Sequence, residues 1–281
     1  VPMVIEKIIR KKIFPKIQSQ PMHLLMNMPV INRKIKDRIR QDVLDVLGGN
    51  LYEVLVGGAG LNPEIERFLT NIGFPITMGY GTTETGPMIT YSDYHDFENG
   101  SCGTAVINME VKILSPDPEN IPGEIVTRGD NVMNGYFKNP EATKAVLDDE
   151  GWFHTGDLAT MSADGHVFIR GRIKNMLLGA NGQNIYPEEI ENKLNSMTMV
   201  NESLVIQHGD KLVGLVHPDM ETAHNLGLND NDINEIMEQN RVELNKTLPS
   251  FCKISTVKIH PEEFAKTPKK SIKRYLYQNA V

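Results

Sequence analysis

The first third of the chain alternates short apolar runs with turns that are rich in glycine. Residues 51–56 (LYEVLV) form an apolar, β-branched run, and the glycine turn 57–60 follows it. The sequence Asn-Pro-Glu at 62–64 then supplies a helix N-cap, a proline at the first helical position and an early acid. A second strand is predicted over 74–78, and it leads into the polar loop 79–87. Because ligands bind beyond the carboxyl ends of strands in α/β sheets, both loops are candidate binding sites.

From about residue 100 the pattern changes to short strands separated by turn residues. The predicted strands are 109–114, 124–128, 158–161 and 166–170, and Asp164-Gly165 is expected to form a two-residue hairpin turn between the last two. A short helix over 140–147, begun by Asn139, interrupts these strands. The pattern predicts a small antiparallel β subdomain.

The last third of the chain mixes helix and strand patterns. A helix is predicted to begin at Pro187, because Ile190, Leu194 and Met197 follow at i, i+4 and i+7 spacing. The further predicted elements are strands over 203–207 and 212–216 joined by the turn 208–210, a helix over 230–248 and a strand over 254–259. This region is therefore predicted to be α+β, with a domain boundary near residues 171–174.

The composition is that of an ordinary soluble protein. A length of 281 residues predicts about two domains, and 23% charged, 40% apolar and 6% aromatic residues exclude the disordered and collagen-like classes. No run approaches the roughly 18 apolar residues of a membrane-spanning helix, so we expect a cytoplasmic protein. Cys102 and Cys252 lie far apart without a CxxC pattern or nearby paired histidines, which predicts neither a disulfide framework nor a zinc site.

The net charge of −7 conceals a basic N-terminal segment. Residues 1–40 carry ten Lys and Arg against two acids, a charge of +8, so the other 241 residues carry −15. Val4, Ile5, Ile8 and Ile9 stand at helical spacing beside these cations. We favour an amphipathic helix packed on its own domain. A helix that lies on the inner face of a membrane is the alternative.

The loop Tyr80-Gly81-Thr82-Thr83-Glu84 combines the groups that a nucleotide needs. A tyrosine ring can stack on a base, threonine hydroxyls and backbone amides can hold a phosphate, and a carboxylate can bind Mg²⁺ together with phosphate oxygens. From the residues alone, a polar turn around a buried tyrosine is an equal alternative.

The glycine turn at 57–60 is weaker evidence. Gly58-Ala59-Gly60 matches the start of the dinucleotide fingerprint, but Pro63 occupies the position of the third glycine. This departure disfavours an NAD-dependent dehydrogenase. A tight turn without a ligand explains the three residues equally well.

Together with three further motifs, these two loops make the sequence resemble the acyl-adenylate-forming superfamily, which includes acyl-CoA synthetases, peptide-synthetase adenylation domains and luciferases. The matching motifs, in the family's order, are Gly57-Gly58-Ala59-Gly60-Leu61, Tyr80-Gly81-Thr82-Thr83-Glu84, Gly123-Glu124-Ile125-Val126 with Gly135-Tyr136, Trp152-Phe153-His154-Thr155-Gly156-Asp157, and Gly171-Arg172 followed by Lys174, Gly182, Glu188, Glu189 and Glu191. The Trp-Phe-His-Thr-Gly-Asp form looks most like long-chain fatty acid:CoA ligases.

The resemblance implies a role for each matching residue. Asp157 would accept hydrogen bonds from both ribose hydroxyls, Arg172 would place a cation near the ribose and phosphate, and Lys174 would be the hinge of a mobile C-terminal domain. The alternatives without a ligand are that Asp157 caps a turn and that Arg172 forms a surface ion pair. The implied nucleotide-binding set is Gly58, Ala59, Gly60, Tyr80, Gly81, Thr82, Thr83, Asp157 and Arg172, with Glu84 as the Mg²⁺ ligand.

The sequence departs from the family pattern at the lysine that contacts the α-phosphate. Residues 266–274 read KTPKKSIKR, and Ser271 stands at the aligned catalytic position. A neutral hydroxyl cannot replace an ammonium group that neutralises phosphate charge. Lys270 or Lys269 could serve if the loop shifts, with Lys273 as a third candidate. A solvated basic tail is the alternative interpretation of this run.

The family's phosphate-binding loop has no counterpart in residues 1–79, and the chain starts with Val1, so we expect the C-terminal half of a longer enzyme. The expected fold class is α/β: 1–99 as part of the large domain's α/β sheet, 100–171 as a small β-barrel, and 172–281 as a mobile α+β domain.

The expected activity is ATP-dependent ligation of a fatty acid to coenzyme A, with ATP, Mg²⁺ and CoA but no nucleic acid. An inactive nucleotide-binding or regulatory fragment, and another carboxylic acid, are the alternatives. Exposed sheet edges favour self-association.

Overall fold

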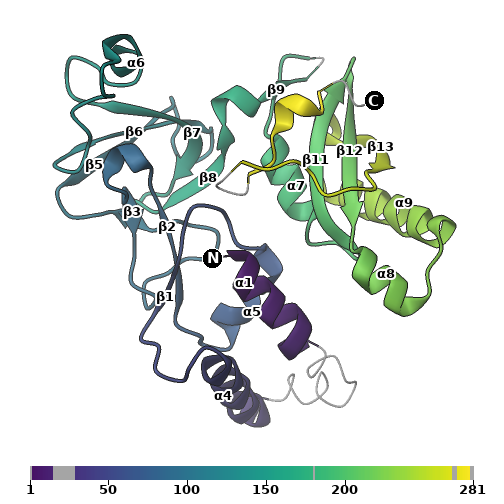
Figure 1. Cartoon of the computed structure of the whole chain (residues 1–281). Coiled ribbons are helices and arrows are strands. Elements are labelled where there is room, and N and C mark those ends of the chain that lie inside the picture. The colour runs from purple at the N-terminus through teal and green to yellow at the C-terminus, as the bar shows by residue number, and fades with distance from the viewer. Residues whose placement is uncertain (1, 15–28, 180, 268–270, 279–281) are drawn as a thin grey trace. The chain divides into compact units, whose positions relative to one another are not determined.

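The computed structural model describes residues 2–14, 29–179, 181–267 and 271–278 (Figure 1). The chain divides into an N-terminal unit, residues 1–169, and a C-terminal unit, residues 170–281. The division lies just before the predicted boundary at 171–174. The finer separation of residues 1–99 from 100–171 stays a prediction.

The first sheet of the N-terminal unit has the order β1-β2-β3-β4. Strands β1 (Val54–Val56) and β2 (Ile76–Tyr80) are parallel, and β3 (Thr90–Tyr91) and β4 (Thr104–Ala105) continue the sheet in antiparallel pairs. Helix α5 (Pro63–Asn71) crosses between β1 and β2, and the side chain of its N-cap Asn62 accepts hydrogen bonds from two backbone amides, as predicted. Both strands begin later than predicted, because Leu51 and Tyr52 are exposed and the second strand starts only after Pro75.

The described parts of the basic N-terminal segment, residues 2–14 and 29–40, belong to helices that pack on their own unit. Helix α1 (Pro2–Ile8), the π-helix Ile9–Ile13 and helix α4 (Pro29–Val46) join α5 around one core. Ile5, Ile9 and Ile13, at i, i+4 and i+8, are all buried in this core. The favoured packed-helix interpretation therefore agrees with the structure. Within the described ranges, no helix has the length and hydropathy to cross a membrane.

The second sheet of the N-terminal unit has the order β5-β6-β7-β8. Its strands are β5 (Met109–Leu114), β6 (Gly123–Gly129), β7 (Phe153–Met161) and β8 (Val167–Arg172), with the short helix α6 (Pro140–Lys144) between β6 and β7. The turn between β7 and β8 is longer than predicted. Ser162 and His166 close it by a backbone hydrogen bond of 2.9 Å, so Ala163, Asp164 and Gly165 form a three-residue turn with Gly165 at φ +91°.

The C-terminal unit contains a three-stranded sheet of order β11-β12-β13 (Figure 1). Strands β11 (Val200–His208) and β12 (Lys211–Pro218) are antiparallel, and β13 (Ile254–Ile259) runs parallel to β12. A small ladder of β9 (Leu177–Leu178) and β10 (Asn184–Ile185) precedes helix α7 (Pro187–Leu194), and helices α8 (Met220–Leu226) and α9 (Asp230–Thr247) follow β12.

Alternating residues of β11 and β12 fill two separate cores. Val205 and Val216 pack in the core that contains α7 and α9 residues, whereas Leu204 and Leu215 pack with Phe264 of the C-terminal segment. This alternation is what a strand with both faces covered produces. The 3₁₀ helices Ile173–Asn175, Ser250–Cys252 and Arg274–Leu276 complete the unit.

Candidate nucleotide-binding site

The two predicted loops leave the same edge of the first sheet. Strands β1 and β2 pair in parallel from Val54 opposite Ile76 to Val56 opposite Met78, so their carboxyl ends lie together. A Cβ on Gly57 would lie 3.4 Å from the Gly79 carbonyl oxygen. The residues proposed for phosphate contact, Gly58, Ala59 and Gly60, are exposed in the first of these loops, with Gly58 at φ +81°.

The loop after β2 is a compact turn that excludes a side chain at Gly81. An added Cβ there would lie 1.7 Å from the Pro87 carbonyl oxygen. The Thr82 amide donates to Thr85 Oγ1 at 3.1 Å, and the two threonine hydroxyls are 3.3 Å apart. Thr83, at the start of the 3₁₀ helix Thr83–Thr85, is exposed. Thr85 thus organises the proposed phosphate loop, a role that no motif in the sequence indicates.

A hydrogen bond brings together two of the proposed ligand-binding residues. The Tyr80 hydroxyl, at the end of β2, donates to Asp157 Oδ2 in β7 at 2.7 Å. Asp157 is only 6% exposed. A carboxylate has about four acceptor positions on its two oxygens, so a hydrogen bond from Tyr80 is compatible with acceptance from ribose hydroxyls.

Glu124 of β6 holds the segment that presents Asp157. Its Oε1 accepts the Gly156 amide at 3.0 Å, and its Oε2 lies 2.8 Å from His154 Nδ1. Thr155 Oγ1 donates to the Ile125 carbonyl at 2.9 Å. These contacts join β6 to β7, so no local sequence pattern reveals them. The position of Glu124 in a family motif is the one sequence feature that points to a role for this residue.

Tyr136 orients the side chain of Glu84, the proposed metal ligand. Its hydroxyl donates to Glu84 Oε1 at 3.0 Å, and burial, together with this bond, raises the pKa of Tyr136. The Met133 amide donates to the Glu84 carbonyl at 2.8 Å, and the Tyr136 amide donates to Thr143 Oγ1 at 2.9 Å. A carboxylate held in this way fits the oxygen ligation that Mg²⁺ prefers.

The predicted hinge lies in the C-terminal unit. Arg172 is the last residue of β8 and is exposed, as is Lys174 in the following 3₁₀ helix. A Cβ on Gly171 would lie 2.7 Å from Glu188 Oε2, and Asn175 Nδ2 donates to Glu188 Oε1 at 2.6 Å. The start of α7 therefore anchors this segment on both sides of Lys174.

The lysine-rich segment folds back on itself. The Lys273 amide donates to the Ala265 carbonyl and the Thr267 amide to the Ser271 carbonyl, each at 2.8 Å. Lys273 is half-buried and Ser271 is exposed. The other two catalytic candidates, Lys269 and Lys270, lie outside the described residues.

A buried ion pair holds the C-terminal end of this lysine-rich segment. Arg274 contacts Glu191 Oε2 in α7, and the Val205 amide donates to Glu191 Oε1 at 2.6 Å. Burial raises the pKa of Glu191 to about 7, against the lowering effect of Arg274 and the amide. The sequence places Glu191 in a motif but gives no sign of its pairing with Arg274.

Comparisons with known proteins place this geometry in a family. Residues 1–137 match the family model described as AMP-binding enzyme, and residues 174–280 match the AMP-binding enzyme C-terminal domain. The 4-coumarate:CoA ligase 1 of Petunia hybrida is 38% identical over 176 residues, 58% of this chain and 32% of that protein. Feruloyl-CoA synthase of an Amycolatopsis species is 36% identical over 184 residues, 63% of this chain and 37% of that protein.

Solved structures agree with the sequence relatives. ATP-bound MatB from Rhodopseudomonas palustris has a TM-score of 0.67 and 25% identity, with 88% of this chain and 50% of that chain covered. The chain spans about a third of the length of the two curated relatives above. The predicted α/β adenylate-forming fold with its C-terminal domain is confirmed. Because both models of the family match in order, the chain belongs to the AMP-binding enzyme superfamily.

Proposed function

We propose that this chain carries the nucleotide-binding part of an ATP-dependent, AMP-forming acid:CoA ligase. The observation that carries the proposal is the hydrogen bond between Tyr80 and Asp157, residues that lie 77 positions apart. It joins the proposed base-stacking ring to the proposed ribose acceptor at the sheet edge where α/β proteins bind ligands. The names of the relatives, which are CoA ligases and synthases, support the same reaction class.

The reaction has two steps in this proposal. A substrate carboxylate oxygen attacks the α-phosphorus of ATP, and pyrophosphate leaves with the bonding electrons. The thiol of CoA then loses its proton and attacks the acyl carbonyl carbon, and AMP leaves. A carboxylate is a weak nucleophile with little proton transfer to assist it. The rate must therefore come from alignment and from positive charge near the phosphate.

The chain's residues supply alignment in this scheme. Asp157 and Arg172 hold the ribose, and Thr82 and Thr83 face the phosphates beside the Gly58-Ala59-Gly60 turn. Lys269, Lys270 and Lys273 are the candidates for the cation at the α-phosphate. Mg²⁺, held through Glu84, would supply charge neutralisation to the phosphate oxygens. Lys174 is the proposed hinge between the two steps.

The acid is proposed at the level of a carboxylic acid. The fatty-acid assignment rested on the Trp-Phe-His-Thr-Gly-Asp motif, and the names of the relatives refer instead to 4-coumarate and feruloyl-CoA. These names make hydroxycinnamates the first acids to assay, with a long-chain fatty acid as the second arm. The comparison requires a longer chain that contains residues 1–281 together with a phosphate-binding loop.

Calorimetry with AMP tests the nucleotide site in the chain itself. We expect weak AMP binding by residues 1–281, and loss of binding in Asp157→Ala, because hydrogen bonds to a charged acceptor are worth about 1.5–3 kcal/mol each. Asp149→Ala is the matched control, since Asp149 is an exposed acid in the same unit. Equal AMP affinity in both variants, or no binding by the wild-type chain, would refute the assignment. We expect no acyl-CoA synthesis from residues 1–281 alone, because residues 1–79 contain no sequence like the family's phosphate-binding loop, on which alignment of the reactants depends.

A further inference from the structure

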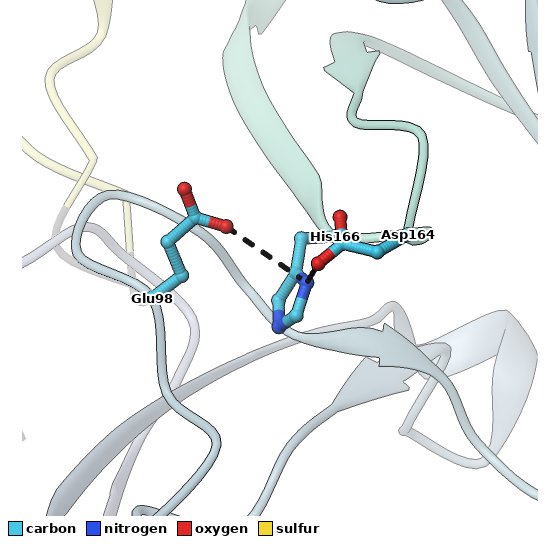
Figure 2. A group of neighbouring side chains, drawn as sticks. All are labelled: Glu98, Asp164 and His166. Atoms are coloured by element: carbon cyan, nitrogen blue, oxygen red, sulfur yellow. Dashed lines mark hydrogen bonds and ion pairs between the residues drawn. The ribbon is translucent and has the colours of Figure 1, made fainter.

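Three potential metal ligands meet in the N-terminal unit, outside the proposed nucleotide site. Glu98 lies in the loop between β3 and β4, and Asp164 and His166 lie in the turn between β7 and β8 (Figure 2). Two backbone hydrogen bonds join these segments, from the Cys102 amide to the Val167 carbonyl at 2.7 Å and from the Val167 amide to the Gly103 carbonyl at 3.0 Å. The two ligand-bearing segments are therefore fixed beside each other.

The surroundings of His166 direct a ring nitrogen at the two carboxylates. The side chain of His166 is only 12% exposed, and its Nε2 lies 3.3 Å from the Asp96 carbonyl oxygen. Nδ1 lies 3.1 Å from Asp164 Oδ2 and 3.9 Å from Glu98 Oε2, so one ring nitrogen and two carboxylate oxygens converge on one point (Figure 2). In the tautomer that donates from Nε2 to the Asp96 carbonyl, the lone pair of Nδ1 faces the two carboxylates, and a metal ion between them would bind all three groups.

The distances suit a metal ion. Zinc bonds to nitrogen and carboxylate oxygen of about 2.1 Å place tetrahedral donor atoms about 3.4 Å apart. The Nδ1–Oδ2 distance is close to this value, the Nδ1–Oε2 distance exceeds it by about half an ångström, and the three ligand atoms all lie within 4.8 Å of one another. Ser162 Oγ donates to Asp164 Oδ1 at 2.5 Å, which orients Oδ2 toward the ring. An anchored imidazole and a hydrogen-bonded carboxylate are the outer contacts that metal ligands usually have.

We propose that Glu98, Asp164 and His166 form a binding site for a divalent transition-metal ion, with Zn²⁺ as the best match. An imidazole and two carboxylates carry a charge of −2, which a dication neutralises, and an imidazole ligand disfavours Mg²⁺ and Ca²⁺. The carboxylates are 52% and 67% exposed, so water can complete the coordination. The ion would tie the β3–β4 loop to the β7–β8 turn. This site contains no cysteine, whereas the expectation of no zinc site rested on the cysteines.

Titration of the metal-free 281-residue chain with ZnCl₂, followed by calorimetry and thermal unfolding, tests the site. We expect one ion per chain and a higher unfolding temperature in its presence. Asp164→Asn and Glu98→Gln change exposed side chains, so the variants should fold, and each should weaken Zn²⁺ binding at least about tenfold. His166→Ala should do the same, although its largely buried ring also contributes packing. Glu119→Gln, an exposed acid on the β5–β6 loop, is the matched control and should bind like the wild type.

Two results would overturn the proposal. Zn²⁺ binding that persists unchanged in an Asp164→Asn, Glu98→Gln double variant would place the ion elsewhere on the chain. No saturable binding by the wild type at millimolar Zn²⁺ would mean that the three side chains contact one another without holding an ion. Neither result depends on enzyme activity, so failure here and failure of the proposed ligase function are distinguishable.

Discussion

The buried carboxyl of Glu191 should make the stability of the C-terminal unit depend on pH. Glu191 is buried, and it accepts hydrogen bonds from Arg274 and from the Val205 amide of β11. Burial raises its pKa from 4.5 to about 7. We predict that Glu191→Gln, which cannot titrate, removes the corresponding pH dependence.

The sign and size of the effect follow from proton linkage. Between pH 4.5 and about 7 the folded carboxyl binds a proton that the unfolded one has released. The stabilisation that this proton provides is complete below pH 4.5 and is lost as the pH rises through about 7. At 1.36 kcal/mol per pKa unit, the shift corresponds to about 3 kcal/mol. The pKa of about 7 already includes the lowering effects of Arg274 and the Val205 amide.

The assay measures the free energy of unfolding of the C-terminal unit in urea at pH values between about 5 and 8. Hydrogen exchange of peptides from β11 reports the unfolding of this unit. The difference between the wild type and Glu191→Gln should fall steadily with rising pH. Glu235→Gln, an exposed acid of α9, controls for loss of a charge and should show no such trend. A constant difference across this pH range would show that burial does not raise the pKa of Glu191.

Three further predictions concern the proposed nucleotide site. Tyr80→Phe removes a donor to the buried carboxylate of Asp157, and chemical denaturation should show a loss of roughly 1.5–3 kcal/mol in unfolding free energy. Gly81→Ala should destabilise the N-terminal unit strongly in a thermal melt, because its Cβ would lie 1.7 Å from a carbonyl oxygen, whereas Gly60→Ala meets no atom within 4 Å and should be close to neutral. Glu84→Gln should weaken binding of ATP in the presence of Mg²⁺ more than in its absence, and calorimetry under both conditions measures the difference.

Elements with a strong local pattern were predicted well, and elements defined by tertiary contacts were not. The strands at 109–114 and 254–259 have the predicted bounds, because alternation and turn residues mark both ends. Helix α4 was missed, although Ile35, Ile39 and Val43 stand at i, i+4 and i+8 and face the core. Its many charged residues concealed that apolar stripe.

The sequence motifs suggest members of the proposed site, which stay a prediction, but they do not indicate the contacts of those residues. Ordered motifs identified Tyr80, Asp157 and Glu84, whereas the bonds that hold them come from segments far away in the sequence. The hydrogen bond from Tyr136 to Glu84 spans 52 positions. The 83-residue separation of Glu191 and Arg274 is likewise beyond any periodicity in a single element. Such pairs depend on how the strands are placed, and composition and spacing do not encode that directly.

The three carboxylates of the N-terminal site are held by a common device. Asp157 and Glu84 each accept a hydrogen bond from a tyrosine hydroxyl, and Glu124 accepts one from a backbone amide. A hydroxyl or amide donor restricts the rotation of a carboxylate without adding a charge of its own. In the proposed function these donors therefore orient Asp157 toward the ribose hydroxyls and Glu84 toward a metal ion. Tyr80→Phe or Tyr136→Phe should therefore loosen the position of Asp157 or Glu84, respectively, without changing the formal charge of the site.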